Sequence, residues 1–502
     1  MDTFTHIING FNVCLTPINL WYTFIGVFMG TIIGVLPGIG PSAGIALLIP
    51  VTFGMNPTSA LIMMCGIYYG TKYGGSTTAI LIRTPGEAAS VMTSIDGYEM
   101  AKKGRAGAAL AVSAIGSFIA GTLGVIGLTI FAVPLSSMAL KFGPAEYFTL
   151  MLFAMTAVST LTGKSAAKGL LATILGLMIA TIGIDLQSGQ ARYTMGVAEF
   201  QDGVGFVVVV VGLFAVAEVF RGLEDIVKGT GAKAMKITGP LWLTKEEWMR
   251  SIGPIWRGGI IGFIIGVLPG AGGTIASIMS YTTEKRLSKN PEEFGHGAIE
   301  GVAGPEAANN SDTAGAMVPL LTLGIPGGGA TAVLMGAFIM YGIQPGPLLF
   351  QNRPDLVWGL IDSMYIGNVM LLILNLPLIG IFVQLLKIPS GILYPLIIAI
   401  SVIGAYAING SMTDLYLILI FGVIGYVFDK IDIPVAPLVL SLVLGGMMEQ
   451  SFRQAMTISG GNPKIFFGSA ITVTLIVMSV ISILMPFILP MLKKYKEDGK
   501  DE

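Results

Sequence analysis

Charged residues are scarce in this chain. Asp, Glu, Lys and Arg make up 11% of its 502 residues, whereas a soluble domain carries about 25%. The mean hydropathy is correspondingly high, at +0.79. A chain with so few ionic groups must have lipid as part of its solvent. Its formal net charge of -1 offers no bulk attraction for nucleic acid.

Cysteine and histidine are also rare. The only cysteines, Cys14 and Cys65, fall in or beside apolar segments, which argues against a disulfide framework or a zinc site. With only His6 and His296, His-based metal or triad chemistry is nearly excluded. The first 17 residues hold no Lys or Arg, so we expect no cleaved signal peptide. We expect no enzyme, no metal site and no cofactor.

Long apolar stretches and abundant glycine are what the chain does have. Stretches long enough to span a bilayer lie near 19–36, 107–133, 144–161, 168–184, 204–220, 254–269, 356–386, 392–408, 415–428, 435–448 and 464–491. Shorter pieces, interrupted by Gly and Pro, lie near 42–53, 57–70, 76–83, 313–323 and 329–343. We expect these to form broken helices or re-entrant hairpins, buried in protein. The fold class is therefore an all-α polytopic membrane protein with about 11–12 transmembrane segments.

An internal repeat organises the chain. Residues 32–40 (IIGVLPGIG) recur as residues 264–272 (IIGVLPGAG), and residues 84–86 (TPG) are echoed by residues 325–327 (IPG). The upstream glycines match as well, Gly26 with Gly258 and Gly30 with Gly262. Corresponding Gly/Pro interruptions in two halves are the best sequence indication of a transporter's binding site.

The distribution of basic residues predicts that the two halves are inverted. The segment 221–257 carries Arg221, Lys228, Lys233, Lys236, Lys245, Arg250 and Arg257, so we expect it in the cytoplasm. The predicted organisation is a first repeat at 1–220, this basic connecting segment at 221–257, and a second repeat at 258–449. Residues 450–502 would be a final transmembrane helix with a charged cytoplasmic tail. The polar segments 92–106 and 281–312 are expected to be mostly solvated.

The repeated breaks could hold an anion. Pro37 and Pro269 should end a helix, the following glycines permit a turn, and Ser42 or Thr274 could cap the next helix. A helix start offers unpaired N–H groups and a partial positive charge to a carboxylate. A plain kink in a packed helix is the alternative.

Two polar segments supply further candidate binding residues. Residues 68–78 are followed by Arg83-Thr84-Pro85-Gly86, and residues 304–313 are followed by Ile325-Pro326-Gly327. Hydroxyl and amide oxygens suit Na⁺, although Asn309 and Asn310 could instead satisfy a buried turn. Lys72 and Arg83 could pair with substrate or snorkel to headgroups. The predicted substrate-binding residues are Gly38, Gly40, Ser42, Ser76, Thr77, Thr78, Arg83, Gly272, Thr274, Asn309, Asn310, Pro326, Gly327 and Gly328. The predicted coupling-ion residues are Asn310, Ser311, Asp312 and Thr313, with Asp312 and Glu306 the first acidic residues to test.

These motifs resemble the TctA family, the large membrane subunits of tripartite tricarboxylate transporters. The most specific strings are 69–76 (YGTKYGGS), 280–286 (SYTTEKR), 305–310 (PEAANN), 323–327 (LGIPG) and 344–347 (QPGP). The resemblance implies a small membrane subunit, a periplasmic solute-binding protein, and cation-coupled (Na⁺ or H⁺) carboxylate uptake across a bacterial inner membrane. Arg83 stands where the family commonly has Asn. An elevator-like secondary transporter is the expected mechanism by analogy; a passive channel or scaffold and an intramembrane enzyme are the alternatives.

Overall fold

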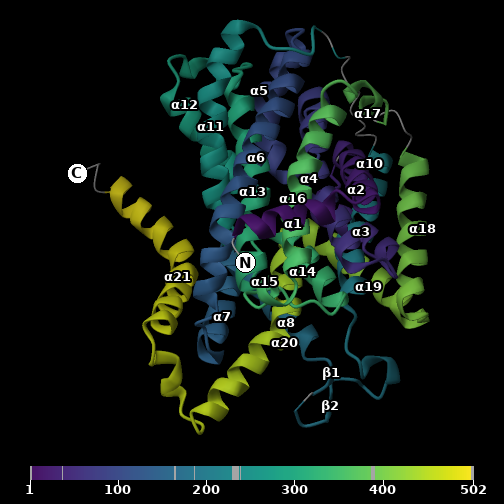
Figure 1. The fold of residues 1–502 in the computed structure, drawn as a ribbon, viewed down its shortest axis with the longest axis vertical. Coiled ribbons are helices and arrows are strands. Elements are labelled where there is room, and N and C mark those ends of the chain that lie inside the picture. Colours follow the sequence, from purple (N-terminus) through teal and green to yellow (C-terminus); the bar gives the residue numbers. More distant parts are fainter. Residues whose placement is uncertain are drawn as a thin grey trace.

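The structure is a computed structural model that describes residues 3–36, 38–162, 165–185, 187–228, 237, 239–385 and 390–498. Pro37, Lys233 and Lys236 lie outside the described residues. The described part is helical apart from one antiparallel pair of two-residue strands, β1 (Gly183–Ile184) and β2 (Ala191–Arg192). The expected all-α class is confirmed, and Figure 1 shows the helices gathered into one elongated bundle from which the C-terminal helix projects.

In chain order, the helices are α1 (Thr3–Cys14), α2 (Pro17–Val35), α3 (Pro41–Leu48), α4 (Pro57–Ile82), α5 (Val91–Lys102), α6 (Ala106–Ala139), α7 (Pro144–Leu161), α8 (Ala166–Ala180), α9 (Phe206–Val210), α10 (Ala217–Lys228), α11 (Lys245–Val267), α12 (Gly272–Leu287), α13 (Glu300–Leu323), α14 (Gly329–Met340), α15 (Leu349–Asn352), α16 (Pro354–Asn375), α17 (Ile379–Leu385), α18 (Ser390–Asn409), α19 (Met412–Lys430), α20 (Val435–Ile458) and α21 (Ala470–Asp498). A π-helical turn, η4 (Val211–Val216), joins α9 to α10. Single 3-10 turns are η1 (Pro50–Thr52), η2 (Ala88–Ser90), η3 (Ala198–Phe200), η5 (Pro291–Glu293) and η6 (Pro463–Phe467).

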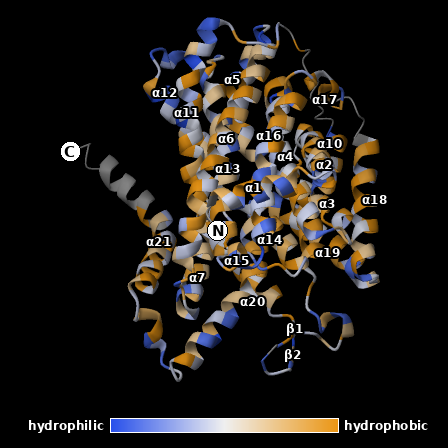
Figure 2. Ribbon diagram, in the orientation of Figure 1, coloured by the Kyte–Doolittle hydropathy of each residue, from blue (hydrophilic) through white to orange (hydrophobic). Residues whose placement is uncertain are grey.

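Seven helices in the described residues are long and apolar enough to cross a membrane. Shorter apolar helices include 41–52, 166–180 and 329–340. Figure 2 shows hydrophobic residues along the middle of the bundle and hydrophilic residues gathered near α5 and α12 at one end and near the strands at the other. The chain is therefore a multi-pass membrane protein, while the expected total of 11–12 spans stays a prediction.

Helices α2 and α4 pack with their backbones almost in contact. A Cβ atom at Gly30 would lie 2.6 Å from the carbonyl oxygen of Ile67, and one at Gly34 would lie 2.8 Å from the Cα of Thr71. The contacts advance in the same direction along both helices, so α2 and α4 run parallel. Small residues permit such close approach between membrane helices, where dispersion contacts drive association.

Helices α11 and α13 pack in the same way. A Cβ atom at Gly262 would lie 2.7 Å from the Cα of Ala308, and one at Gly266 would lie 2.5 Å from the carbonyl oxygen of Asp312. These helices also run parallel to each other. The glycines of α11 at this contact are thus the ones that the internal repeat matches to the glycines of α2.

Helices α4 and α13 cross at the centre of the bundle and run in opposite directions. Lys72 contacts Asn309, whereas Ser76, one turn later on α4, contacts Glu306, one turn earlier on α13. Helix α2 runs parallel to α4, and α11 runs parallel to α13. The pair α2–α4 therefore points in the opposite direction to the pair α11–α13.

Two expectations are wrong, one about the short apolar pieces and one about a polar segment. The pieces 57–70 and 76–83 belong to one continuous 26-residue helix, α4, and 313–323 is the second half of α13. Residues 301–312 were expected to be mostly solvated, yet they are buried in the first half of α13. Tertiary packing against α2 and α11 keeps these glycine-containing helices continuous, although glycine weakens an isolated helix by about 1 kcal/mol.

The sequence of the apolar stretch 356–386 is compatible with one tilted helix or with two pieces around Asn375. The structure has two helices, α16 ending at Asn375 and α17 beginning at Ile379. Asp362 is fully buried within α16. Asp185 lies beside β1 in a polar loop.

The loop that holds β1 and β2 is fastened to α20 by ion pairs. Arg453 donates to both carboxylate oxygens of Asp185, at 3.1 and 2.7 Å, and Arg192 donates to Glu449 at 2.8 Å. The Arg453 guanidinium, helped by backbone N–H groups, holds the pKa of Asp185 well below its usual range. The carboxylate therefore stabilises this loop above its ordinary pKa, and that contribution is lost as the pH falls through the lowered value.

Candidate functional site

The two repeated Pro-Gly motifs break their helices with the same geometry. Helix α2 ends before Leu36 (φ -83°, ψ 119°), and α11 ends before Leu268 (φ -83°, ψ 120°). Gly38 and Gly270 then adopt φ values of 86° and 83°, which L side chains rarely adopt. Each break is followed by a new helix, α3 or α12. The alternative of a plain kink is therefore wrong at both positions.

The helices that follow the breaks begin without a side-chain cap. The N-cap residues are Gly40 for α3 and Ala271 for α12, and neither makes a side-chain capping bond. Ser42 and Thr274 were expected as possible caps; they instead lie inside the first turns. No side chain in the described part of the chain accepts a hydrogen bond from the first N–H groups of either helix, which leaves a partial positive charge at each start.

The second pair of motifs, residues 84–86 and 325–327, lies beside the first pair of breaks. The Gly86 N–H donates to the Gly75 carbonyl at 3.3 Å, and Gly86 packs against the backbone of Gly34. In the other half, the Gly270 N–H donates to the Gly327 carbonyl at 2.8 Å. All four interruptions thus lie close to the ends of α2 and α11.

A buried group of four polar side chains lies between α4 and α13, and we call it the central polar group: Lys72, Glu87, Asn309 and Asp312. The Lys72 ammonium donates to Asn309 Oδ1 at 2.8 Å and lies 3.3 Å from Glu87 Oε2 and 3.9 Å from Asp312 Oδ2. Asn309 Nδ2 donates to Glu87 Oε1 at 2.7 Å. Only 4% of the Lys72 surface is exposed, so the alternative that it snorkels to headgroups is wrong.

The central polar group connects the two breaks. A Cβ atom at Gly273, in the first turn of α12, would lie 2.8 Å from Lys72 Nζ. On the other side, a Cβ atom at Gly40 would lie 3.9 Å from Glu87 Cβ. The start of α12 therefore lies against Lys72, Asn309 and Asp312, and the start of α3 lies beside the Glu87 side chain.

A second buried carboxylate lies one turn away. Glu306 accepts hydrogen bonds from Ser76 Oγ and Thr93 Oγ1. Asn310 Nδ2 donates to Ser117 Oγ at 2.6 Å and to the Glu306 carbonyl at 3.0 Å. Asn309 and Asn310 are in the middle of α13, so the alternative that they satisfy a turn is wrong.

The four predicted coupling-ion residues are consecutive in α13 and all buried. One oxygen of each lacks a hydrogen-bond partner in the described structure: Asn310 Oδ1, Ser311 Oγ, Asp312 Oδ1 and Thr313 Oγ1. Consecutive helical residues point about 100° apart, and the structure separates these side chains accordingly. Asn310 and Ser311 face α6, near Ser117 and Gly124, whereas Asp312 faces Lys72.

The remaining predicted substrate residues have varied places. Ser42 Oγ lies 3.1 Å from where a Cβ atom of Gly329 would be, so the first turns of α3 and α14 meet. Thr77 and Thr78 are buried in α4, and Gly328 precedes α14 as its N-cap. Arg83 ends α4 with a φ of 56° and is exposed, with its guanidinium 5.6 Å from the ring of Tyr98. Arg83 therefore lies outside the central polar group.

Sequence reasoning missed Glu87, Thr93 and Ser117. Glu87 directly follows the Thr84-Pro85-Gly86 break, so an acidic residue beside a break was the available signal. Thr93 and Ser117 carry no such signal, because their contacts depend on α5 and α6 packing against α13. Among the described residues, no cluster of three His, Cys, Asp or Glu side chains could hold a metal ion.

Comparison with known proteins identifies the family. The model of the tripartite tricarboxylate transporter TctA family matches residues 20–440. The chain belongs to the TctA family. The recognition from sequence is thereby confirmed, and so are the expectations of a transmembrane transporter subunit and of no enzyme.

Two proteins of Agrobacterium vitis are similar to this TctA-family chain. The "Uncharacterized 52.8 kDa protein in TAR-I ttuC' 3'region" is 48% identical over 480 residues, covering 96% of this chain and 95% of that protein. The "Uncharacterized protein in TAR-II ttuC' 3'region" is 47% identical over 236 residues, covering 47% of this chain and 97% of that protein. No solved structure matches the chain.

Proposed function

We propose that this TctA-family protein is the permease subunit of a secondary transporter that imports tricarboxylates or related carboxylates into a bacterial cell. Its partners are a small membrane subunit and a periplasmic solute-binding protein, and its driving force is a Na⁺ or H⁺ gradient. The observation that carries the proposal is that one uncapped helix start lies against Lys72 and another lies beside the Glu87 side chain, its ion-pair partner. A carboxylate suits both the helix starts and the lysine.

The two halves, 1–220 and 258–449, are inverted repeats in this proposal. The matched break geometries and the opposite directions of the α2–α4 and α11–α13 pairs support this. So do the basic residues at the end of α5, the start of α11 and the end of α12, because these three helices lie together at one end of the bundle in Figure 1. By the positive-inside rule that end, with the segment 221–257, is cytoplasmic. Residues 450–502 return the chain to that side.

Charge balance in the core favours cation coupling. Among the described residues, Lys72 is the one basic side chain in and around the central polar group, against three buried acidic ones, Glu87, Glu306 and Asp312. Unpaired charge is costly at membrane depth, so a proton or a metal cation offsets the excess. A tricarboxylate entering a cell that is negative inside also opposes about 7 kcal/mol at 100 mV, and coupled cations must supply that energy. A moving body that holds both breaks, as in an elevator, would carry substrate and cation together.

The test of the function is uptake by the complete three-part system in proteoliposomes. Concentrative uptake of citrate or succinate that collapses when Na⁺ and pH gradients are removed supports a coupled transporter. Uptake that only equilibrates, whatever the gradients, contradicts the proposal and favours the channel.

For the placement of the site, we expect Asn310→Ala and Pro326→Ala each to lower the initial uptake rate at least about tenfold. Asn310→Ala removes the amide that bridges Ser117 and the Glu306 carbonyl, and Pro326→Ala loosens the segment that reaches Gly270. Membrane expression of each variant is the control. Normal uptake by both variants would defeat the placement.

For coupling, we expect Asp312→Asn to reduce gradient-driven uptake about tenfold or more, because it removes the carboxylate that shares Lys72 with Glu87. The measurement is the dependence of uptake on Na⁺ and on pH at fixed substrate. The exposed Glu199→Gln is the charge-matched control and should match the wild type. A variant that keeps the wild-type ion dependence would remove Asp312 from the coupling site.

A further inference from the structure

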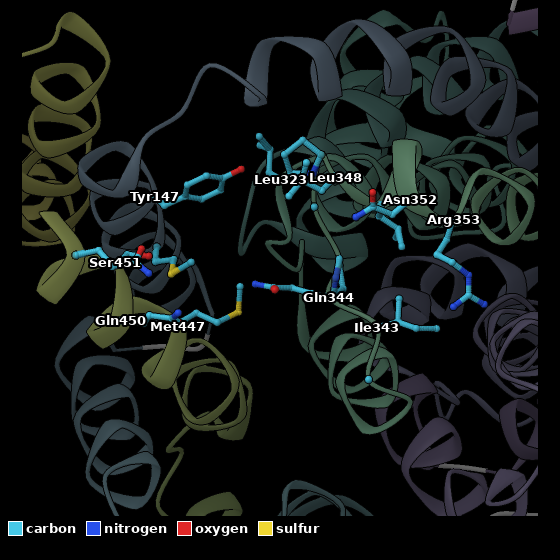
Figure 3. A pocket seen from close by; sticks show the side chains of 17 residues that line it. Tyr147, Leu323, Ile343, Gln344, Leu348, Asn352, Arg353, Met447, Gln450 and Ser451 are labelled. Atoms are coloured by element: carbon cyan, nitrogen blue, oxygen red, sulfur yellow. The ribbon is translucent and has the colours of Figure 1, made fainter. Parts of the chain in front are cut away.

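A separate cavity lies on the other side of the α13–α14 break from the central polar group, and we call it the outer cavity. Its volume is about 490 Å³, within the range of about 300–1,000 Å³ typical of small-molecule sites. Its polar lining includes Tyr147, Gln344, Asn352, Arg353, Gln450 and Gln454. The walls are α7 and α20 on one side and the connection from α14 to α16 on the other (Figure 3).

The chemistry of the lining suits an anion. None of the 17 described lining residues is acidic, and the polar ones are amides, hydroxyls and a single guanidinium, all of which donate hydrogen bonds. Figure 3 shows the Tyr147 hydroxyl and the Gln344 amide directed toward the same space from opposite walls; Arg353 lies at the outer rim beyond Asn352, with its guanidinium turned away from that space.

These donors are not used elsewhere in the described structure. The side chains of Arg353, Gln344, Gln450 and Gln454 make no hydrogen bond or ion pair with another described residue. The guanidinium also sits at the start of α16, whose N-cap is Arg353 and whose first turn receives no side-chain cap. That helix start adds positive potential at the rim. Asp355, in the same turn, is exposed and does not line the cavity.

The outer cavity adjoins the breaks of the proposed transport site. Leu323, the last residue of α13, lines it, and a Cβ atom at Gly324 would lie 2.6 Å from the carbonyl oxygen of Pro345. From Gly324 the chain turns back to Gly327, which accepts the hydrogen bond from Gly270. The segment 324–328 therefore separates the cavity from the inner breaks.

We infer that the outer cavity is a second carboxylate-binding site, a vestibule that takes the substrate anion from the periplasmic side before it reaches the central breaks. The inference rests on the proposed function and orientation. Residues of α7, α15 and α20 line the cavity, and these helices lie in the half of the bundle away from the labelled parts of α5, α11 and α12 (Figure 1). Arg353 supplies the charge, and the amides and Tyr147 supply neutral donors for the remaining oxygens.

The first test is the concentration dependence of citrate and succinate uptake by the three-part system. We expect Arg353→Gln to raise the half-saturating concentration about fivefold, as loss of an exposed ion pair would, with the maximal rate within twofold of wild type. Lys141→Gln removes another exposed cation, at the turn between α6 and α7 outside the cavity, and should change neither value. Equal half-saturation in wild type and Arg353→Gln would overturn the inference.

Two variants that each add one negative charge to the same connection give a sharper test. Gln344→Glu places a negative charge in the cavity, whereas Gln351→Glu places the same charge seven residues later on an exposed side chain that does not line it. We expect the first to weaken uptake more than Arg353→Gln does and the second to leave it unchanged. Equal effects of the two variants would contradict a site in this cavity.

A binding measurement keeps the inference separate from the proposed function. Cys14 and Cys65 are buried, so Gln344→Cys provides one accessible thiol for a membrane-impermeant thiol reagent. We expect labelling from the periplasmic side only, slowed by citrate or succinate, and no protection in Gln351→Cys. Protection without any uptake by the wild type would refute the proposed function and retain the site. Normal wild-type uptake with no protection would refute the site alone.

Discussion

Replacing Lys72 with Met is expected to destabilise the protein by about 3–5 kcal/mol, because it leaves buried carboxylates without their cation. Lys72 lies 3.3 Å from Glu87 and 3.9 Å from Asp312, and all three side chains are almost fully buried. Thermal unfolding of the purified protein in detergent measures the effect. Lys102→Met is the matched control, since Lys102 is half exposed and its pairing with Glu99 contributes little.

A double variant separates folding from transport. Adding Glu87→Gln to Lys72→Met removes one of the two stranded carboxylates, so part of the lost stability should return. Uptake should stay at least about tenfold below wild type, because the cation that we propose to meet the substrate is still absent. If Lys72→Met alone unfolds at the wild-type temperature, the central polar group is not a buried ion-pair network.

Replacing Gly262 with Ala is the second change with a large expected effect, a loss of about 3 kcal/mol from overpacking. The added Cβ atom would collide with the carbonyl oxygen of Ala308 and lie 2.7 Å from its Cα. Neither backbone can yield, because both belong to long helices. Thermal unfolding and the yield of folded protein in detergent would show the loss.

Gly446→Ala in α20 is the matched control, since a Cβ atom there would meet nothing within 4 Å. It should be neutral or slightly stabilising, by the helix preference of alanine. Gly30→Ala should repeat the loss in the other half, because its Cβ atom would lie 2.6 Å from the carbonyl oxygen of Ile67. Tolerance of both Gly30→Ala and Gly262→Ala would contradict the close packing of the two helix pairs.

The breaks could be predicted from sequence because their cause is local. Gly38 and Gly270 need positive φ values, and a Pro-Gly string ends a helix wherever it occurs. The recurrence of the same string in both halves then indicated that the two breaks serve the same site. The same local signals failed for α4, where Gly70, Gly74 and Gly75 look like interruptions but Gly70 and Gly74 lie against α2 in a continuous helix.

The partners within the site could not be predicted from one sequence. Lys72 bonds to Asn309 across 237 residues, and Thr93 to Glu306 across 213. Those pairings depend on the register at which α4 and α13 cross, which is set by the packing of the whole bundle. The same register divides Asn310, Ser311 and Asp312 among different neighbours, although their adjacency in sequence suggested one ion site.

The two broken helices are held in unlike ways, and this has a consequence for how a passage could open. After α11, the Gly270 N–H donates a main-chain hydrogen bond to the Gly327 carbonyl. After α2, Gly38 instead lies against the side chain of Glu218 on α10. A side chain can swing away by changing rotamer, but a main-chain bond parts only if two backbone segments separate. Within the described residues, the segment at Gly38 is therefore held through a side chain and the segment at Gly270 through the main chain, so the two breaks need not yield equally when the protein changes conformation.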